Sequence, residues 1–303
     1  MTSKARPDTT IALGTALTIF SAVSFGLYPA ATRAIYADGG NASFVILAAT
    51  FARAISLSLF CVVTGKKFLS TREDIRLGAT GGLFQALSSL GIISALVYLP
   101  GPVMIIILFS HTLMLLVYMA LKKEITADVP TVITTLSALL GLSFVLNLWS
   151  IDLTYSLIGI SLALVGAIAT ASRVYVYGKQ TTTKNPAVVG AENFLMAALF
   201  VCPIVFFSLP ALPSTMEGYF YTVAACLSLI AGTFAMFYGI SMIGAFRFSL
   251  FLKLEPVFTT IFSILIVNEV LQWQQYAGIA LVIGSLVTYQ TYDKIKKSKC
   301  LAS

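Results

Sequence analysis

Ten apolar runs, each close to twenty residues long, fill almost the whole chain. We place them at 11–34, 43–64, 76–98, 102–121, 129–148, 154–177, 187–209, 217–241, 246–267 and 273–292. About 20 apolar residues are what an α-helix needs to cross the hydrocarbon core of a bilayer. The strands of a membrane barrel are about half as long and alternate in polarity, so they do not fit these runs. The pattern predicts an all-α integral membrane protein with ten transmembrane helices.

The residues that end these runs repeat halfway along the chain. Ala31-Thr32-Arg33 closes the first run as Ala171-Ser172-Arg173 closes the sixth, and Glu124 follows the fourth run as Glu269 follows the ninth. One repeat of about 140 residues therefore holds five runs. Because five is odd, the second set must cross the membrane in the opposite sense. We expect two inverted five-helix repeats at 11–148 and 154–292, between a short tail at 1–10 and a basic tail at 293–303.

The charge distribution is that of a membrane protein. Apolar residues make up 58% of the chain and charged residues 10%, against roughly 25% charged in a typical soluble domain. The net charge of +7 does not indicate a nucleic-acid partner, because 15 of the 19 Lys and Arg residues cluster in alternate connections between the runs. By the positive-inside rule this predicts a multi-pass protein of the cell or inner membrane with both termini in the cytoplasm.

The charged residues inside the runs are the first candidates for function, because each costs at least ~2.5 kcal/mol in hydrocarbon. Lys253 and Glu255 lie two residues apart in the ninth run, so they point to different faces of a helix and each needs its own partner. Glu192 in the seventh run and Arg53 in the second supply opposite charges. One interpretation is a polar cavity that recognises a zwitterion or an organic acid. The other is a set of buried ion pairs that fixes how the helices pack.

Three further groups of residues have both a functional and a structural interpretation. His111, the only histidine, lies midway along the fourth run and is either a packing residue or a polar group of a cavity. Arg33 and Arg173 fall in the last turn of their runs, where a long side chain reaches the headgroups, so we assign them, with Arg53, to structural charge. Pro29 and Pro256 lie inside runs and are candidate hinges.

Catalysis and cofactors are not indicated. The four cysteines and the one histidine form no ligand cluster, so we predict no metal and no cofactor. No phosphate-binding loop and no nucleophile–base motif is present, so we predict neither an ATP-driven pump nor an enzyme.

The ninth run and the residues after it resemble the second-half signature of the drug/metabolite transporter superfamily, EamA type. The matching stretches are Gly244-Ala245-Phe246-Arg247, Leu254-Glu255-Pro256-Val257-Phe258, Asn268-Glu269-Val270-Leu271, Gln275 and Gly278. The first half resembles it more weakly, through Phe25-Gly26, Arg53, Tyr98 and Lys123-Glu124-Ile125-Thr126, and Thr112 stands where the family has a proline. The resemblance implies two inverted repeats, with the fourth and ninth helices beside a central cavity, and a proton- or gradient-linked carrier.

We therefore expect a secondary active transporter that exports small metabolites such as amino acids by alternating access. Its partners would be the small-molecule substrate, the lipid bilayer and protons, and it would be a monomer or a homodimer. The predicted substrate-binding residues are Lys253, His111, Glu192, Tyr28, Tyr98 and Tyr238. Glu192 and Glu255 are the candidates for proton coupling, because a carboxylate in a low dielectric can load and release a proton near neutral pH.

Three alternatives stay open. The first is an antiporter for phosphorylated sugars or nucleotide-sugars, which would need paired basic residues facing a cavity. The other two are a membrane-embedded enzyme and a channel.

Overall fold

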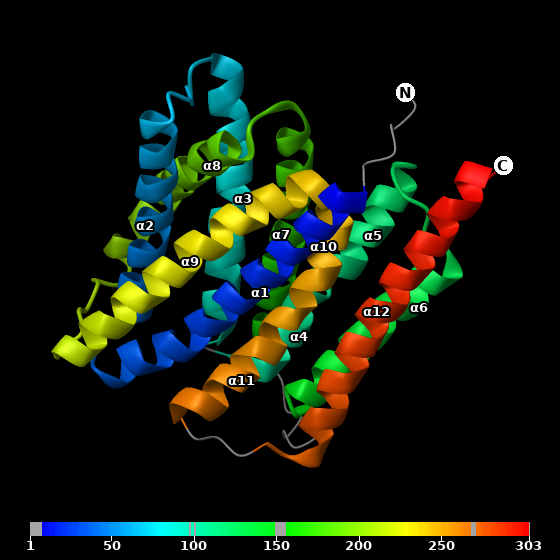
Figure 1. Ribbon diagram of the computed structural model, residues 1–303. Coiled ribbons are helices and arrows are strands. Elements are labelled where there is room, and N and C mark those ends of the chain that lie inside the picture. Colours follow the sequence, from blue (N-terminus) through cyan, green and yellow to red (C-terminus); the bar gives the residue numbers. More distant parts are fainter. Residues whose placement is uncertain (1–7, 97, 100, 149–155, 268–270, 303) are drawn as a thin grey trace.

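The computed structural model describes residues 8–96, 98–99, 101–148, 156–267 and 271–302. These residues form helices and no strand. Grouped by the connections between them, the helices make ten segments (Figure 1): α1 (Asp8–Ala37), α2 (Ala42–Val63), α3 (Arg72–Leu96), α4 (Gly101–Phe109) with α5 (His111–Leu121), α6 (Val129–Val145), α7 (Leu157–Thr183), α8 (Pro186–Val201) with η2 (Cys202–Phe206), α9 (Met216–Ile243), α10 (Ala245–Phe251) with η3 (Leu252–Leu254) and α11 (Glu255–Val267), and α12 (Trp273–Ala302). The predicted all-α class is confirmed.

Among the described residues, six segments are long and apolar enough, by length and composition alone, to cross a membrane. They are α1, α2, α7, α9, the α4–α5 pair from Pro102 to Leu121, and the stretch from Pro186 to Ile204. The remaining four segments are α3, α6, the α10–η3–α11 segment and α12. Of these, α6 is a shorter apolar helix of 17 residues.

The two halves of the chain pack against each other in a pattern that is unchanged when they are exchanged. α1 lies along α9 as α7 lies along α3, and α1 meets α11 as α7 meets α4 and α5. The pairs α2–α8 and α6–α12 each map onto themselves. Figure 1 shows α1 beside α9 and α6 beside α12. Each of these contacts joins one helix from each half, so the expected repeats interleave instead of forming two separate bundles.

Small residues set the closest of these approaches. α6 and α12 cross at Gly141 and Gly278, where a Cβ on Gly278 would lie 2.6 Å from the Gly141 carbonyl oxygen. Such contacts are how helices pack in lipid, where no hydrophobic force drives helix against helix.

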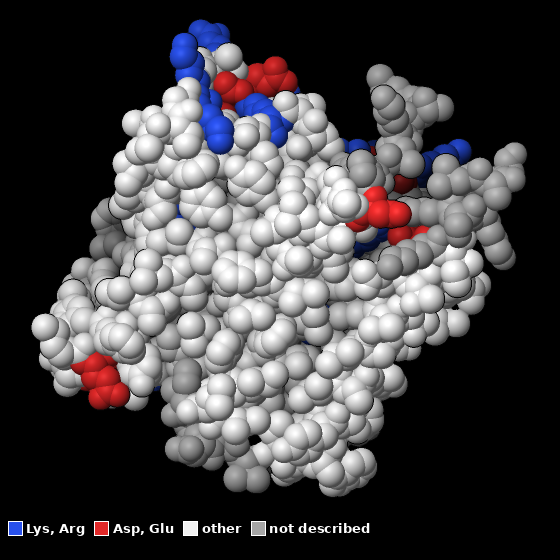
Figure 2. All heavy atoms as spheres, in the orientation of Figure 1, with Lys and Arg blue, Asp and Glu red and all other residues white. Residues whose placement is uncertain are grey.

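The outer surface separates charge from apolar side chains. Figure 2 shows most Lys and Arg gathered at one end of the visible face, above a broad region with few charges, and a patch of Asp and Glu at the opposite end. Large apolar side chains such as Ile133, Leu227 and Val62 are more than half exposed on the sides of the helices. An exposed apolar belt of this kind fits a lipid environment.

Candidate functional site

Both fourth helices, one in each half, are interrupted midway. α4 ends at Phe109 and α5 begins at His111, with Ser110 between them. α10 ends at Phe251, and the 3₁₀ turn η3 leads into α11. In the second half the cause is local, because Pro256 has no N–H to donate to the carbonyl four residues earlier. In the first half the hydroxyl of Ser110 hydrogen-bonds back to the Ile107 carbonyl at 2.6 Å, which competes with the helical pattern.

The two interruptions contact each other. Lys253 on η3 is fully buried, and its Nζ donates to the carbonyl oxygen of Phe109 at 3.3 Å. That oxygen lies at the C-terminal end of α4, where the helix dipole favours a positive charge. The ammonium of one repeat therefore caps the broken helix of the other.

His111 extends this contact. Its Nδ1 lies 2.8 Å from the Leu108 carbonyl and its Nε2 lies 2.9 Å from Ser249 Oγ. A carbonyl only accepts, so Nδ1 carries a proton, and Nε2 of the neutral ring accepts from the Ser249 hydroxyl. The Thr112 hydroxyl then donates to Ser249 Oγ at 2.9 Å. Every member of this chain is satisfied with a neutral imidazole.

A cavity of about 240 Å³ lies beside this crossing. Its walls come from both halves, and its ionisable lining residues are Tyr28, Arg53, His111, Arg173 and Glu255. Phenylalanines such as Phe25, Phe194 and Phe248 supply apolar wall. α1 passes close to the break in α11, because a Cβ on Gly26 would lie 2.9 Å from Phe258 Cβ and 3.0 Å from the Glu255 carbonyl oxygen. Only glycine permits that approach, which accounts for the Phe25-Gly26 pair.

Each of the two cavity arginines donates one hydrogen bond to another residue of the chain. Arg53 Nε donates to the Ala49 carbonyl at 2.8 Å, and its guanidinium carbon lies 4.5 Å from the centroid of the Phe194 ring. Arg173 Nη1 donates to Gln85 Oε1 at 3.2 Å, while its Nε is buried without a hydrogen-bond partner. Both arginines line the same cavity as the carboxylate of Glu255.

The predicted site residues divide into three groups. Tyr28, His111 and Glu255 line the cavity, and Lys253 lies fully buried in the adjoining crossing without lining the cavity. Tyr98, Tyr238 and Glu192 are not part of the lining. Of the three arginines that we assigned to structural charge, the structure brings two into the cavity.

Arg173 differs most from its expected position. We placed it in the last turn of its helix, but α7 continues to Thr183, ten residues farther on, so Arg173 lies well inside. Arg33 lies four residues before the end of α1 and is exposed. Of the two candidate hinges, Pro256 adjoins the break at η3, whereas α1 continues as one helix through Pro29.

Gln85 and Thr170 are lining residues that the sequence reasoning missed. A long amide in the middle of an apolar run is the signal that could have identified Gln85.

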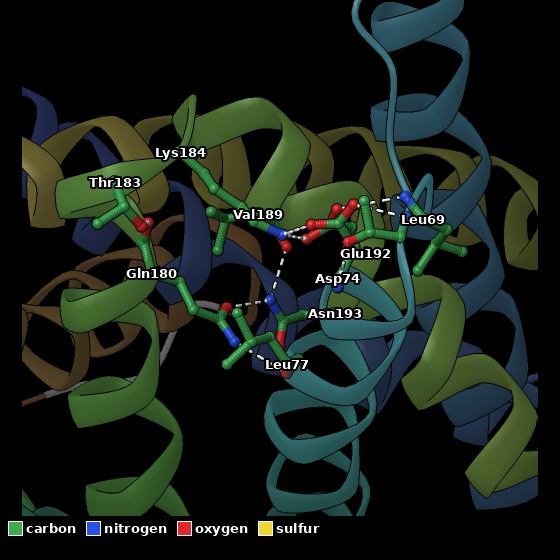
Figure 3. A network of polar contacts seen from close by, with 10 residues as sticks. Leu69, Asp74, Leu77, Gln180, Thr183, Lys184, Val189, Glu192 and Asn193 are labelled. Atoms are coloured by element: carbon green, nitrogen blue, oxygen red, sulfur yellow. Dashed lines mark hydrogen bonds and ion pairs between the residues drawn. The ribbon is translucent and has the colours of Figure 1, made fainter.

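Glu192 belongs to a separate polar network (Figure 3). This network lies at the end of the molecule where most Lys and Arg gather, which we call the basic end. Its side chain is 1% exposed, accepts from Lys184 Nζ at 2.8 Å and from the Leu69 N–H at 3.2 Å, and shares Lys184 with Asp74. The hydrogen bond from Lys184 lowers the pKa of Asp74 to about 2. Burial alone would lower the pKa of Lys184, but its bonds to Asp74 and Glu192 raise it. Glu192 is thus tied into an ion-pair network outside the cavity.

Ion pairs of the described residues occur only at the basic end. Three of them join the two halves: Lys179–Glu124 at 2.7 Å, Lys184–Asp74, and Lys296–Asp128 at 2.6 Å. For Glu124 and Asp128, burial opposes ionisation, but the hydrogen bonds from lysine and neighbouring hydroxyls outweigh it and lower the pKa of each.

At the opposite end of the molecule, hydrogen bonds join described residues of the two halves. Asp38 accepts from the Thr215 N–H at 2.8 Å, and Asn41 Nδ2 donates to the Leu209 carbonyl at 2.7 Å.

Two other motif stretches converge at the basic end. A second cavity, of about 690 Å³, is lined by both 244–247 and 123–126, two stretches quoted for the family resemblance. Asn268, Glu269 and Val270, from the same signature, lie outside the described residues.

Comparisons with known proteins agree with this architecture. Residues 157–289 match the model of the EamA-like transporter family. A solved structure titled only "Crystal structure of protein" superposes with a TM-score of 0.74 over 91% of this chain and 96% of its own, at 16% identity, which shows a shared fold. No curated protein matches the sequence.

Proposed function

We propose, from the premise that residues 157–289 form an EamA-like transporter domain, that this chain is a secondary active transporter which exports small metabolites such as amino acids. We place it in the cell or inner membrane with both termini in the cytoplasm, as the positive-inside rule predicts from the basic connections.

The observation that carries the proposal is the cavity at the crossing of the two interrupted helices. Broken helices that meet near the middle of inverted repeats are how many secondary transporters build a substrate site. At about 240 Å³ the cavity is smaller than the roughly 300–1,000 Å³ of pockets for drug-sized ligands, so it suits a small metabolite.

Polar contacts between described residues join the two halves at both ends in this structure: ion pairs at the basic end, and hydrogen bonds at the opposite end. Alternating access would require each set to break in turn as one repeat rocks against the other around the crossing. Among the two carboxylates considered for proton coupling, Glu255 lines the cavity and Glu192 is bound to Lys184, so we assign coupling to Glu255.

A carrier of phosphorylated sugars is the second candidate. Its requirement for paired basic residues facing a cavity is met by Arg53 and Arg173. The volume of the cavity argues against a nucleotide-sugar and leaves the smaller phosphate esters.

The test is solute exchange in proteoliposomes. Vesicles that contain the purified protein are loaded with a panel of labelled amino acids and phosphorylated sugars, and release is measured with and without an imposed pH gradient. We expect release above that of empty vesicles for at least one solute, and a response to the gradient. Absence of release for the whole panel contradicts the proposal, and fluxes of millions per second would indicate a channel.

A further inference from the structure

We infer that the central cavity selects small organic anions, and that a substrate's acid groups bind between Arg53 and Arg173 while an amino group, where there is one, binds at Glu255. This inference rests on the proposed function, because it names the substrate class of the same site. It separates acidic metabolites from the neutral amino acids that the fold alone would also accommodate.

The first argument is the balance of charge. Arg53 and Arg173 bring two positive charges to the wall and Glu255 brings one negative charge. A neutral His111 ring satisfies both of its hydrogen bonds and adds no charge. Lys253, just behind the wall, is bound to a backbone carbonyl and no described carboxylate pairs with it. A site with this excess of positive charge is completed by an occupant with net negative charge.

The second argument is the state of the hydrogen-bond donors. Arg53 is anchored through Nε, and no described residue accepts a hydrogen bond from its two Nη groups. Arg173 is anchored through Nη1, and no described residue accepts a hydrogen bond from its Nη2. Planar guanidinium groups with open donors are suited to bidentate binding of carboxylates. The sites where a ligand would bind are therefore the parts of both side chains that the protein leaves unfilled.

The third argument concerns the wall around these groups. Phe25, Phe194 and Phe248 face the same cavity, and Phe194 covers one face of the Arg53 guanidinium. Apolar walls exclude water and strengthen the attraction between opposite charges. An uncharged amide in place of an acid would leave a buried guanidinium unpaired, which is the costly case.

The experiment compares acids with their amides. The full-length protein in proteoliposomes is assayed by counterflow with L-glutamate against L-glutamine, L-aspartate against L-asparagine, and succinate alone, with glycerol 3-phosphate as the phosphate arm. We expect apparent KM values for the acids that are about 30-fold or more below those for the amides, because loss of one partner of a buried charge pair has effects of this size.

The variants have a matched control. Arg53→Gln and Arg173→Gln should abolish the preference for acids, and Arg173→Lys, which keeps the charge, should retain part of it. Arg33→Gln makes the same change at an exposed residue outside the cavity lining and should leave the preference unchanged. Glu255→Gln should lower the preference for glutamate over the amine-free glutarate. Detergent-solubilised variants that elute as wild type does in size-exclusion chromatography are folded, so their transport can be interpreted.

The outcomes separate the inference from the proposed function. Exchange of amides as fast as acids overturns the inference and leaves the transporter. Exchange confined to glycerol 3-phosphate supports anion selection and assigns phosphate as the acid group. If no solute exchanges but calorimetry shows glutamate binding that Arg53→Gln abolishes, the inference holds and the transport proposal fails. If amides exchange and no acid does, only the inference is wrong. If no solute binds or exchanges, both are wrong.

Discussion

Replacing Lys184 with methionine tests whether the Glu192 network is structural. Lys184 is the only described cation paired with Glu192, and their Nζ–Oε2 distance is 2.8 Å. Glu192 is 1% exposed, so removing the ammonium leaves a buried carboxylate with the Leu69 N–H as its remaining hydrogen-bond partner. Loss of one partner from a fully buried pair costs about 3–5 kcal/mol. Lys184 itself is 20% exposed, so water can replace part of the interaction and we expect roughly 2–3 kcal/mol.

The assay is the thermal midpoint of the purified protein in detergent. For large domains, each kcal/mol shifts the midpoint by about 2–4 °C, so Lys184→Met should lower it by roughly 5 °C or more. Adding Glu192→Gln removes the stranded charge and should restore at least about 1 kcal/mol of the loss.

Lys179→Met is the matched control, since Lys179 pairs with Glu124 but is 53% exposed, and an exposed pair contributes less than ~1 kcal/mol. The burial argument is wrong if Lys184→Met has the same melting midpoint as Lys179→Met. It is also wrong if the variant carrying both Lys184→Met and Glu192→Gln is less stable than Lys184→Met alone. A companion measurement addresses coupling, because uptake by Glu192→Gln should still respond to a pH gradient if Glu255 carries the proton.

Three further predictions follow from single contacts. Lys253→Met removes both the bond to the Phe109 carbonyl and a buried charge. We expect the melting midpoint to stay unchanged or rise slightly, while exchange in counterflow slows at least tenfold. A variant that loses both thermal stability and exchange would refute this expectation. Gly26→Ala would place a methyl group 3.0 Å from the Glu255 carbonyl oxygen, so it should destabilise by about 1–3 kcal/mol in melting experiments, and wild-type stability would show that α1 and α11 can move apart. The pKa of Asp74 is about 2 in the folded protein and near 3.9 in an unfolded chain. The ionised carboxylate therefore stabilises the folded protein above about pH 4, and this stabilisation is lost as the pH falls toward 2. The melting midpoint of Asp74→Asn should fall less steeply than that of the wild type between pH 5 and pH 2.5.

The helical architecture could be predicted because the bilayer imposes a length on each apolar run. The C-terminal end of α7 was predicted too early because Gly178 to Thr183 are no longer apolar, although the helix continues past the hydrocarbon region. This error moved Arg173 toward the surface and hid one of the two cavity arginines. Hydropathy marks where lipid ends, and it does not mark where hydrogen bonding along the helix ends.

The candidate site was less predictable than the fold. The pair Lys253 and Glu255 pointed to the correct helix, and the break beside Pro256 has a local cause in sequence. Whether a charged side chain faces the cavity or a neighbouring helix depends on crossings between segments that lie far apart in the chain. Glu192 illustrates this. Its partner Lys184 comes from the preceding connection, but Leu69, which donates to Glu192, and Asp74, which shares Lys184, come from the other half of the chain.

The interleaving of the two halves bears on how the chain is made. α1 ends at Ala37 and its main partner α9 begins at Met216, so about 180 residues must be synthesised before the two helices can meet. At 5–20 residues per second, the ribosome takes roughly 10–35 s over that stretch. During this interval α1 is already in the bilayer with lipid on the face that α9 will later cover. This face of α1 carries Gly14 and several Ser and Thr side chains, which suit it first to lipid and later to contact with α9.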